Sequence, residues 1–222
     1  SANARTRFDD DGDCLPFVSF SGKCLNRNQD RMFEILYELA SRVDFNNHAR
    51  LRQLILEYRA GLEAAVVHNG PRLAISLASR NFTPANHLQE IWGGVHQLHT
   101  IKQVETETAD DGMQRLTANL QAIGETLFYR NNVKLALIGE MAMLAKAADP
   151  VNTLTGALAA GGTDGFTPPR LDVAPDLPME GWSTSTAVSF VAQTFQTVRL
   201  GHADSPALSV IAKILRSMYL HR

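Results

Sequence analysis

A glycine- and proline-rich stretch at residues 156–181 divides the sequence into two unequal parts. It holds five of the fifteen glycines and four of the nine prolines of the chain. Proline lacks the backbone N–H that helices and strand ladders use, and glycine weakens both, so neither element continues through such a stretch. We therefore predict a linker and a domain boundary here. The run Gly161–Gly165 could also suggest a phosphate-binding loop, but no apolar strand leads into it, which favours the linker.

Before this linker, apolar residues recur every three or four positions, the spacing of one buried face of a helix. Polar capping residues or a proline at the first helical position open each predicted helix. The predicted starts are Asn26 or Asn28, Asn47, Thr83-Pro84 and Asp110-Asp111. The apolar stripes are Met32, Leu36, Leu39 and Val43; Leu51, Leu54, Ile55, Tyr58, Leu62 and Val66; Leu88, Ile91, Trp92, Val95 and Leu98; and Met113, Leu116, Leu120, Ile123 and Leu127.

Two of these predicted helices contain glycines or a proline. Pro71 follows Asn69-Gly70 and should interrupt the second helix, because proline clashes with the preceding turn. Gly93-Gly94 should lie inside the third helix, where each glycine costs roughly 1 kcal/mol against alanine unless a neighbour packs closely. A short helix is also expected over residues 140–148.

Three segments predict strands: residues 17–21, 133–138 and 185–200. The first has no evident partner nearby, and the last is apolar on both faces, as in a strand buried on both sides. Ser205-Pro206 should then start a final helix. One strand and one helix cannot bury their own apolar faces, so we expect them to be loosely held or docked elsewhere. The predicted fold is α+β and predominantly helical, with the chain an internal piece of a larger protein.

The composition is that of an ordinary globular protein, with 45% hydrophobic residues and a net charge of −2. It gives no reason to expect nucleic acid or a membrane as partner, since basic clusters and long apolar runs are absent from the sequence. Ser1–Ala4 resembles an expression tag, and residues 1–13 are a polar lead-in whose acidic run is expected to be a solvated turn. Cys14 and Cys24 predict half-buried thiols in a reducing compartment, with a disulfide across a turn as the alternative.

A search for catalytic motifs finds none that is complete. The nearest approach to a helical zinc motif is His87-Leu88-Gln89-Glu90, in which Ile91 replaces the second histidine. His96 and His99 share a helix face but lack a third ligand. The sequence contains no nucleophile elbow or P-loop. We therefore predict no catalytic, substrate-binding or metal-binding residue. The remaining histidines, His48, His68, His202 and His221, have no visible catalytic companion.

Three ordered stretches nevertheless resemble the presequence-protease branch of the pitrilysin/insulinase zinc metallopeptidases. They are Phe20–Leu25 with Asn28 and Met32–Leu36; Arg50–Arg52 through Leu62-Glu63 to Asn69-Gly70 with Ala74; and Val188–Val191, Gly201, Leu208–Leu215 and Tyr219–Arg222. The resemblance implies α/β domains in which helices pack on an antiparallel sheet. It places residues 14–155 late in the third of four domains and residues 182–222 at the start of the fourth.

The resemblance also implies a function for the parent protein, a zinc metalloendopeptidase that degrades unstructured peptides. This chain would be a catalytically inactive section of its C-terminal half, forming chamber wall and domain packing. Zinc would then be bound elsewhere in the parent, and the partners would be the N-terminal half of the same chain and peptide substrates. An intracellular site, bacterial cytoplasm or organelle matrix, is expected. The alternatives are a stand-alone helical interaction module and an inactive peptidase homologue with a structural role.

Overall fold

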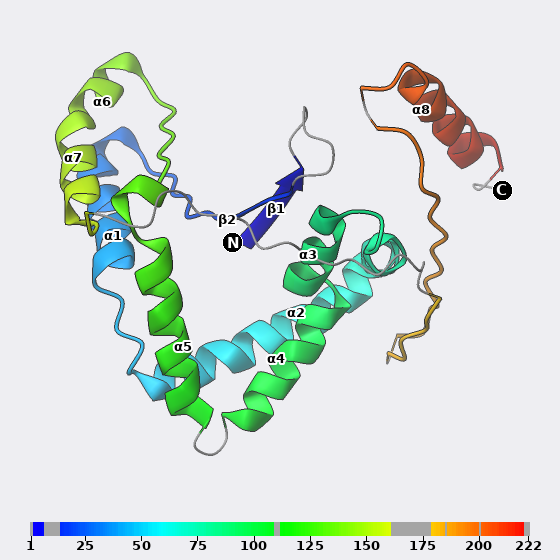
Figure 1. Ribbon diagram of the computed structural model, residues 1–222, viewed down its shortest axis with the longest axis horizontal. Coiled ribbons are helices and arrows are strands. Elements are labelled where there is room, and N and C mark those ends of the chain that lie inside the picture. The colour runs from blue at the N-terminus through cyan, green and yellow to red at the C-terminus, as the bar shows by residue number, and fades with distance from the viewer. Residues whose placement is uncertain are drawn as a thin grey trace.

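The computed structural model describes residues 2–6, 14–108, 112–160, 179–184, 186–199 and 201–219, and these are mostly helical (Figure 1). The helices are α1 Gln29–Ser41, α2 His48–Ser79, α3 Pro84–Gly93, α4 Val95–Glu107, α5 Gly112–Leu127, α6 Met141–Lys146, α7 Ala148–Ala157 and α8 Ser205–Ile214. Short 3-10 turns lie at Asn26–Asn28 and Arg130–Asn132, and a π turn at Leu215–Tyr219 extends α8. The predominantly helical prediction is confirmed.

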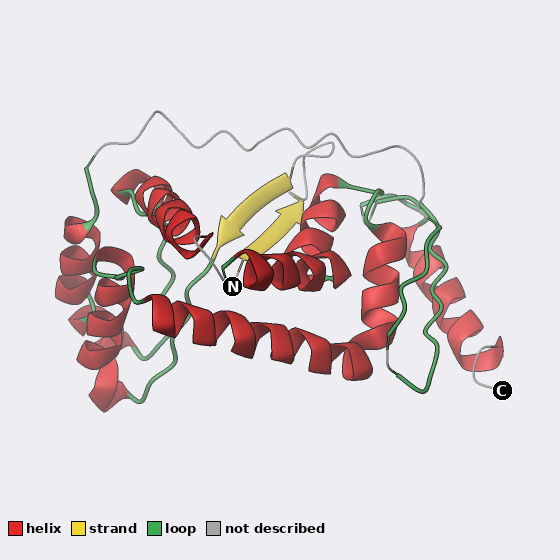
Figure 2. Cartoon of the chain, turned by 90° about the horizontal axis from the view of Figure 1, so that it is seen from below, coloured by secondary structure: helices red, strands yellow, loops and turns green. Residues whose placement is uncertain are grey.

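The predicted sheet is much smaller than expected. In the described part of the chain it comprises β1, Ala2–Thr6, and β2, Cys14–Val18, which pair antiparallel (Figure 2). The strand predicted at 17–21 therefore lies three residues earlier, and its partner includes residues that the sequence suggested were a tag. Pro16 is tolerated because both strands of a two-stranded sheet are edge strands. The hairpin packs against α3.

The two other predicted strands do not form. Residues 133–138 have no regular structure, and neither do residues 186–199. A strand needs a neighbour for its backbone N–H and C=O groups, and no third strand lies among the described residues to provide one. The prediction of helices packed on an antiparallel sheet is therefore wrong beyond the hairpin.

The predicted helix starts agree with the structure better than the predicted strands do. The Asn47 side chain accepts a hydrogen bond from the Arg50 backbone N–H at 3.1 Å, which caps α2. Thr83 caps α3 in the same way through the Asn86 N–H, also at 3.1 Å, with a proline at the first helical turn. Both caps are confirmed. Asn28 precedes α1 but makes no capping side-chain bond, and Asp110-Asp111 lies outside the described residues.

The helices form two groups joined by the long helix α2. At one end of the molecule α1 packs on α7, with α6 and α5 nearby; at the other, α2, α3 and α4 pack together beside the hairpin (Figure 1). In both views α8 lies at the far end from α1 and α7 (Figure 2). No described helix is both long and apolar enough to cross a membrane.

The buried core is small for a chain of this size. Fully buried apolar side chains are Phe33, Leu73, Ala85, Leu88, Met113, Ala147, Leu154 and Leu158. The accessible surface is 16655 Å². A compact monomer of 24.4 kDa would expose only about 10,000 Å². The chain therefore has an open shape, and many residues of the predicted apolar stripes remain exposed.

Candidate functional site: a buried glutamate at the α3–α4 junction

Glu90, near the end of α3, is the most deeply buried polar side chain described, with 0% of its surface exposed. Its Oε1 accepts a hydrogen bond from the backbone N–H of His96 at 3.2 Å. The same oxygen lies 3.0 Å from the His96 ring Nδ1. Oε2 has no hydrogen-bond partner within the described structure. A buried carboxyl group with one oxygen unpaired is energetically costly, so its surroundings must hold it in place.

The position of Glu90 explains the Gly93-Gly94 pair and corrects the prediction that both lie inside one helix. The chain breaks here: α3 ends at Gly93, α4 begins at Val95, and Gly94 between them adopts an extended conformation. Gly94 has no side chain to cap α4, and Glu90 instead accepts a hydrogen bond from the His96 backbone N–H in the first turn of α4. A Cβ at Gly94 would overlap the Glu90 carboxyl, so a side chain at this position would have to displace that carboxyl.

The histidines near Glu90 do not complete a metal site among the described residues. His87 lies one turn before Glu90, and its Nδ1 is buried without a hydrogen-bond partner among the described residues. His96 and His99 instead contact Trp182, with ring centroids 5.4 and 6.3 Å apart. In the parts of the chain that are described, no three His, Cys, Asp or Glu side chains are placed to hold a metal ion.

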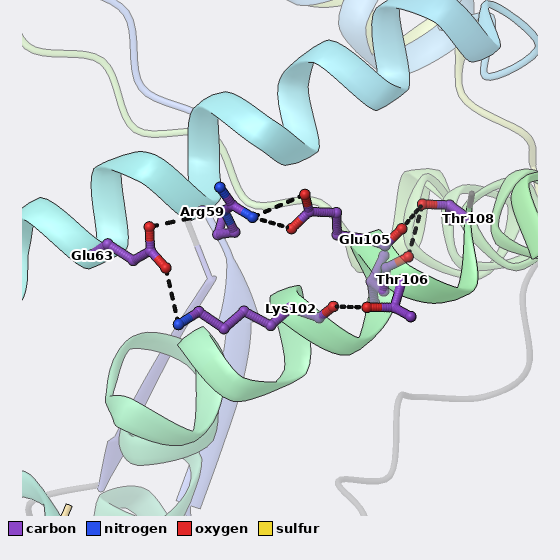
Figure 3. Close-up of polar contacts among 7 residues, drawn as sticks. Arg59, Glu63, Lys102, Glu105, Thr106 and Thr108 are labelled. Carbon is purple, nitrogen blue, oxygen red and sulfur yellow. Dashed lines mark hydrogen bonds and ion pairs between the residues drawn. The ribbon is translucent and has the colours of Figure 1, made fainter. Parts of the chain in front are cut away.

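A row of ion pairs fixes α4 against α2 (Figure 3). Arg59 Nη1 donates to both carboxylate oxygens of Glu105, at 2.9 and 2.7 Å. Lys102 Nζ lies 2.9 Å from Glu63 Oε1. The hydrogen bond from Lys102 is the main cause that lowers the pKa of Glu63. The apolar stripes of the sequence did not predict these ion pairs between α2 and α4. Charged residues on a helix face are equally typical of a face exposed to solvent.

The last described residues of the linker and the segment that follows them lie over this helical unit. Glu180 forms an ion pair with Arg80, just past the end of α2. Trp182 then covers the two histidines of α4. Farther along, Thr194 donates a hydrogen bond to the Ala78 carbonyl at 3.0 Å. The segment is thus fixed at several points, although it forms no strand.

Phe190 of this segment lies on the kink of α2. The kink is at Asn69, where the backbone is non-helical with φ of −116° and ψ of 15°, and helical structure resumes beyond it to Ser79, so the predicted interruption is confirmed. Gly70 is buried there, and a Cβ on it would overlap the Phe190 ring. The glycine therefore allows the close approach of the segment to α2.

The two cysteines are free thiols. Cys14 is partly buried and Cys24 is exposed, so only one matches the predicted half-buried state, and no disulfide joins them. Burial raises the pKa of the Cys14 thiol, which makes it a poorer nucleophile. Within the described residues the α3–α4 junction therefore positions helices and the Trp182 segment, and it does not assemble a nucleophile or a metal.

Comparison with known proteins gives this helical unit a context. Residues 1–104 match the family described as peptidase M-16C associated. The mitochondrial presequence protease of Danio rerio is 25% identical over 233 residues, covering 92% of this chain and 22% of that protein. The presequence protease of Yarrowia lipolytica is 24% identical and Protein HypA of Clostridium perfringens 23%, each covering 92% of this chain and 20% of the relative.

The chain thus spans about a fifth of the length of these relatives. The matches run over most of the chain, which confirms the resemblance inferred from the sequence. The sequence-based division into domains stays a prediction. Residues 1–104 match the region associated with this peptidase family, and over most of its length the chain shows distant homology to the mitochondrial presequence proteases.

Proposed function

We propose that this chain is a non-catalytic section of a zinc-dependent metalloendopeptidase that degrades unstructured peptides. In the parent enzyme it would form part of the chamber wall and pack against other domains. The observation that carries the proposal is the homology to presequence proteases, which covers 92% of this chain but only 20–22% of the relatives' length. The family resemblance supplies the zinc chemistry and the peptide substrates.

The open shape of the chain supports a packing role. Its accessible surface of 16655 Å² is far above the roughly 10,000 Å² of a compact monomer. Part of the excess is apolar: α8 and the segment before it expose Val191, Phe195, Leu208 and Ile211 among others. Apolar surface on this scale is typical of an interface that another part of a protein covers.

The zinc site itself does not fit the described residues. Hydrolytic zinc needs two or three nitrogen or carboxylate ligands held together, and no such group of three is present in the described ranges. His96 and Glu90 are adjacent, but Glu90 is engaged at the start of α4. Zinc would therefore be held by another part of the parent, and we derive no hydrolytic step from this chain.

Peptide hydrolysis tests the proposal directly. The parent enzyme and the isolated chain would be assayed on an unstructured fluorogenic peptide, with and without a zinc chelator. We expect chelator-sensitive hydrolysis by the parent and none by the isolated chain. In the parent, Leu208→Asp with Ile211→Asp should lower the rate at least tenfold, and the exposed Glu38→Gln should not. Chelator-sensitive hydrolysis by the pure isolated chain would overturn the proposal.

The exposed apolar face of α8 also fits the alternative, a stand-alone helical module that binds a partner protein. The native reading frame separates the two. A frame that continues on both sides and encodes His-x-x-Glu-His upstream supports the peptidase. A parent that carries the chain but hydrolyses no peptide would instead indicate an inactive homologue with a structural role.

A further inference from the structure

A solvent-open cavity of about 580 Å³ lies on the helical group that contains α1 and α7. Its wall is formed by the end of α1, the loop at residues 42–47, the second half of α5 and the end of α7. This volume is within the range of small-ligand sites, roughly 300–1,000 Å³. Leu39 and Val43, which belong to the apolar stripe of α1, stay exposed because they face this cavity rather than a packed helix.

The lining combines aromatic rings with negative charge. Phe45, Phe128 and Tyr129 provide the rings, and Leu158 provides a buried apolar surface. Two carboxylates, Asp44 and Glu125, also belong to the lining, and no lysine or arginine does. Aromatic faces and carboxylates both attract cations, and a planar guanidinium can stack on a ring while it binds carboxylate oxygens.

The nearby arginines do not neutralise these carboxylates. The Arg42 guanidinium lies over the Tyr37 ring, 5.2 Å from its centroid. Arg130 donates to the carbonyls of Thr155 and Gly156, at 3.0 and 3.2 Å, at the end of α7. Both cations are thus engaged outside the cavity.

Each carboxylate has only neutral partners among the described residues. Asp44 Oδ1 accepts from the Asn46 backbone N–H at 2.8 Å and from its side-chain amide at 2.9 Å. Glu125 Oε1 accepts from the Gln121 amide at 3.3 Å. The cavity therefore carries two negative charges without a paired cation in the described structure.

We propose that this cavity binds the arginine side chain of an unstructured peptide. The guanidinium would bind the carboxylates of Asp44 and Glu125, and the methylene stem would lie on the rings of Phe45 and Phe128. Arginine fits better than lysine, because the lining offers flat rings as well as carboxylate acceptors. The source of the peptide rests on the proposed function; the chemistry of the cavity does not.

The probe for this site is a heptapeptide, acetyl-Gly-Ser-Gly-Arg-Gly-Ser-Gly-amide, with a twin that carries citrulline in place of arginine. Citrulline keeps the shape and one N–H donor edge, but a carbonyl replaces the other NH2 group and the charge is removed. NMR titration of the intact 222-residue chain would follow backbone shifts at Val43, Gly124 and Tyr129. We expect saturable binding of the arginine peptide, at least tenfold weaker binding of the citrulline peptide, and weakening by added salt.

The variant Asp44→Asn with Glu125→Gln should weaken binding of the arginine peptide at least tenfold. Both side chains are exposed and their amides keep the acceptor oxygen, so the fold should survive, which circular dichroism would verify. Glu38→Gln, an exposed glutamate of α1 outside the cavity, should leave binding unchanged. Equal affinity for the two peptides, wild-type affinity in the double variant, or no saturable binding overturns the inference. A peptide with leucine in place of arginine that binds more tightly than the arginine peptide also overturns the inference, because the cavity would then accept an apolar segment.

The outcome of this titration can be distinguished from the outcome of the test of the proposed function. The titration uses the isolated chain and needs no hydrolysis, so arginine binding can fail while the parent remains a peptidase. Conversely, the cavity can bind arginine in a parent that proves inactive.

Discussion

Helices α4 and α8 are similar in length and both are amphipathic, yet their surroundings differ completely. α4 is capped by a buried carboxyl from α3, joined to α2 by ion pairs and covered by Trp182. α8 is the more apolar of the two, but it makes no capping side-chain bond and contains no buried residue. Among the described elements, α8 packs mainly against the π turn that extends it. An apolar stripe therefore predicts a buried face only when the chain also contains the surface that covers it.

The difference also shows two ways to hold a helix. α4 has no fully buried side chain of its own and is fixed by polar contacts at its start and along one face. α8 carries Leu208, Val210, Ile211 and Ile214 in a stripe that would bury well, if a partner were present. Polar contacts within the chain can be satisfied locally, whereas the apolar face of α8 depends on a partner. We therefore expect the two helices to differ in energetics as they do in structure.

The largest difference should appear when the same substitution is made in the core and in α8. Leu88 is 7% exposed and Leu208 is 37% exposed. Leu88→Ala should lower the free energy of unfolding by about 2–5 kcal/mol, because it leaves a cavity between α3 and the elements that pack against it. Leu208→Ala should cost less than about 1 kcal/mol, since its side chain already contacts water and alanine favours the helix. Chemical denaturation of both variants measures the difference. Equal losses would show that α8 is packed.

The next effect concerns the capping carboxyl. Glu90→Ala should cost about 1–3 kcal/mol, because it leaves the buried N–H of His96 without its acceptor. Glu38→Ala, on the exposed face of α1, is the matched control and should change stability by less than about 0.5 kcal/mol. Thermal and denaturant unfolding would measure both. A Glu90 variant as stable as the control would mean that α4 needs no cap from α3.

A double-mutant cycle sharpens this test. Gly94→Ala alone should be destabilising, because the new Cβ must displace the Glu90 carboxyl. In the Glu90→Ala background the same change should cost little, since Gly94 has φ near −99°, which any residue adopts. The two substitutions should therefore be strongly non-additive. Simple additivity would show that Gly94 is required for a reason other than Glu90.

These results bear on how much the sequence could predict. The caps at Asn47 and Thr83 and the start of α8 followed from local chemistry, because a cap depends on residues within one turn. The strands at 133–138 and 186–199 failed for a non-local reason. Alternating apolar residues predict a strand, but a strand forms only beside another, and the sequence does not show whether a neighbour exists.

The candidate site was only partly predictable. The sequence drew attention to His87, Glu90, His96 and His99 as weak candidate ligands and favoured packing or surface roles for the histidines, which stays a prediction. The role of Glu90 as a cap for the next helix was missed, because the Gly93-Gly94 pair was expected inside a helix rather than between two. A carboxyl three or four residues before a glycine pair is the feature that could have suggested it. Trp182 could not be placed, since 86 residues separate it from His96 along the chain.

A smaller and more local effect is expected where the 186–199 segment lies on α2. Gly70→Ala should displace the Phe190 ring and release the segment. The helix itself should gain little, because Gly70 directly precedes Pro71, whose ring disfavours a Cβ on the preceding residue in helical backbone. Amide hydrogen exchange should therefore accelerate across residues 186–199 while the melting temperature changes little. Phe190→Ala should release the segment equally, and the double variant should add nothing further. Unchanged exchange in Gly70→Ala would contradict the docking of this segment.

The smallest effect belongs to the ion pairs between α2 and α4, and it depends on pH. The Lys102 hydrogen bond lowers the pKa of Glu63 in the folded chain. A lowered pKa means that this contact contributes stability above the ordinary carboxyl value, about 4.3, and loses it as pH falls through the folded pKa. An NMR titration of the Glu63 carboxyl carbon should give a midpoint below that ordinary value, and Lys102→Met should raise the midpoint. Because Glu63 is at the surface, added salt should weaken the effect, which separates these ion pairs from the salt-insensitive burial of Leu88. If neither the Lys102 substitution nor added salt changes the Glu63 midpoint, the ion pairs do not hold α4. The Glu90 cap would then be its main attachment.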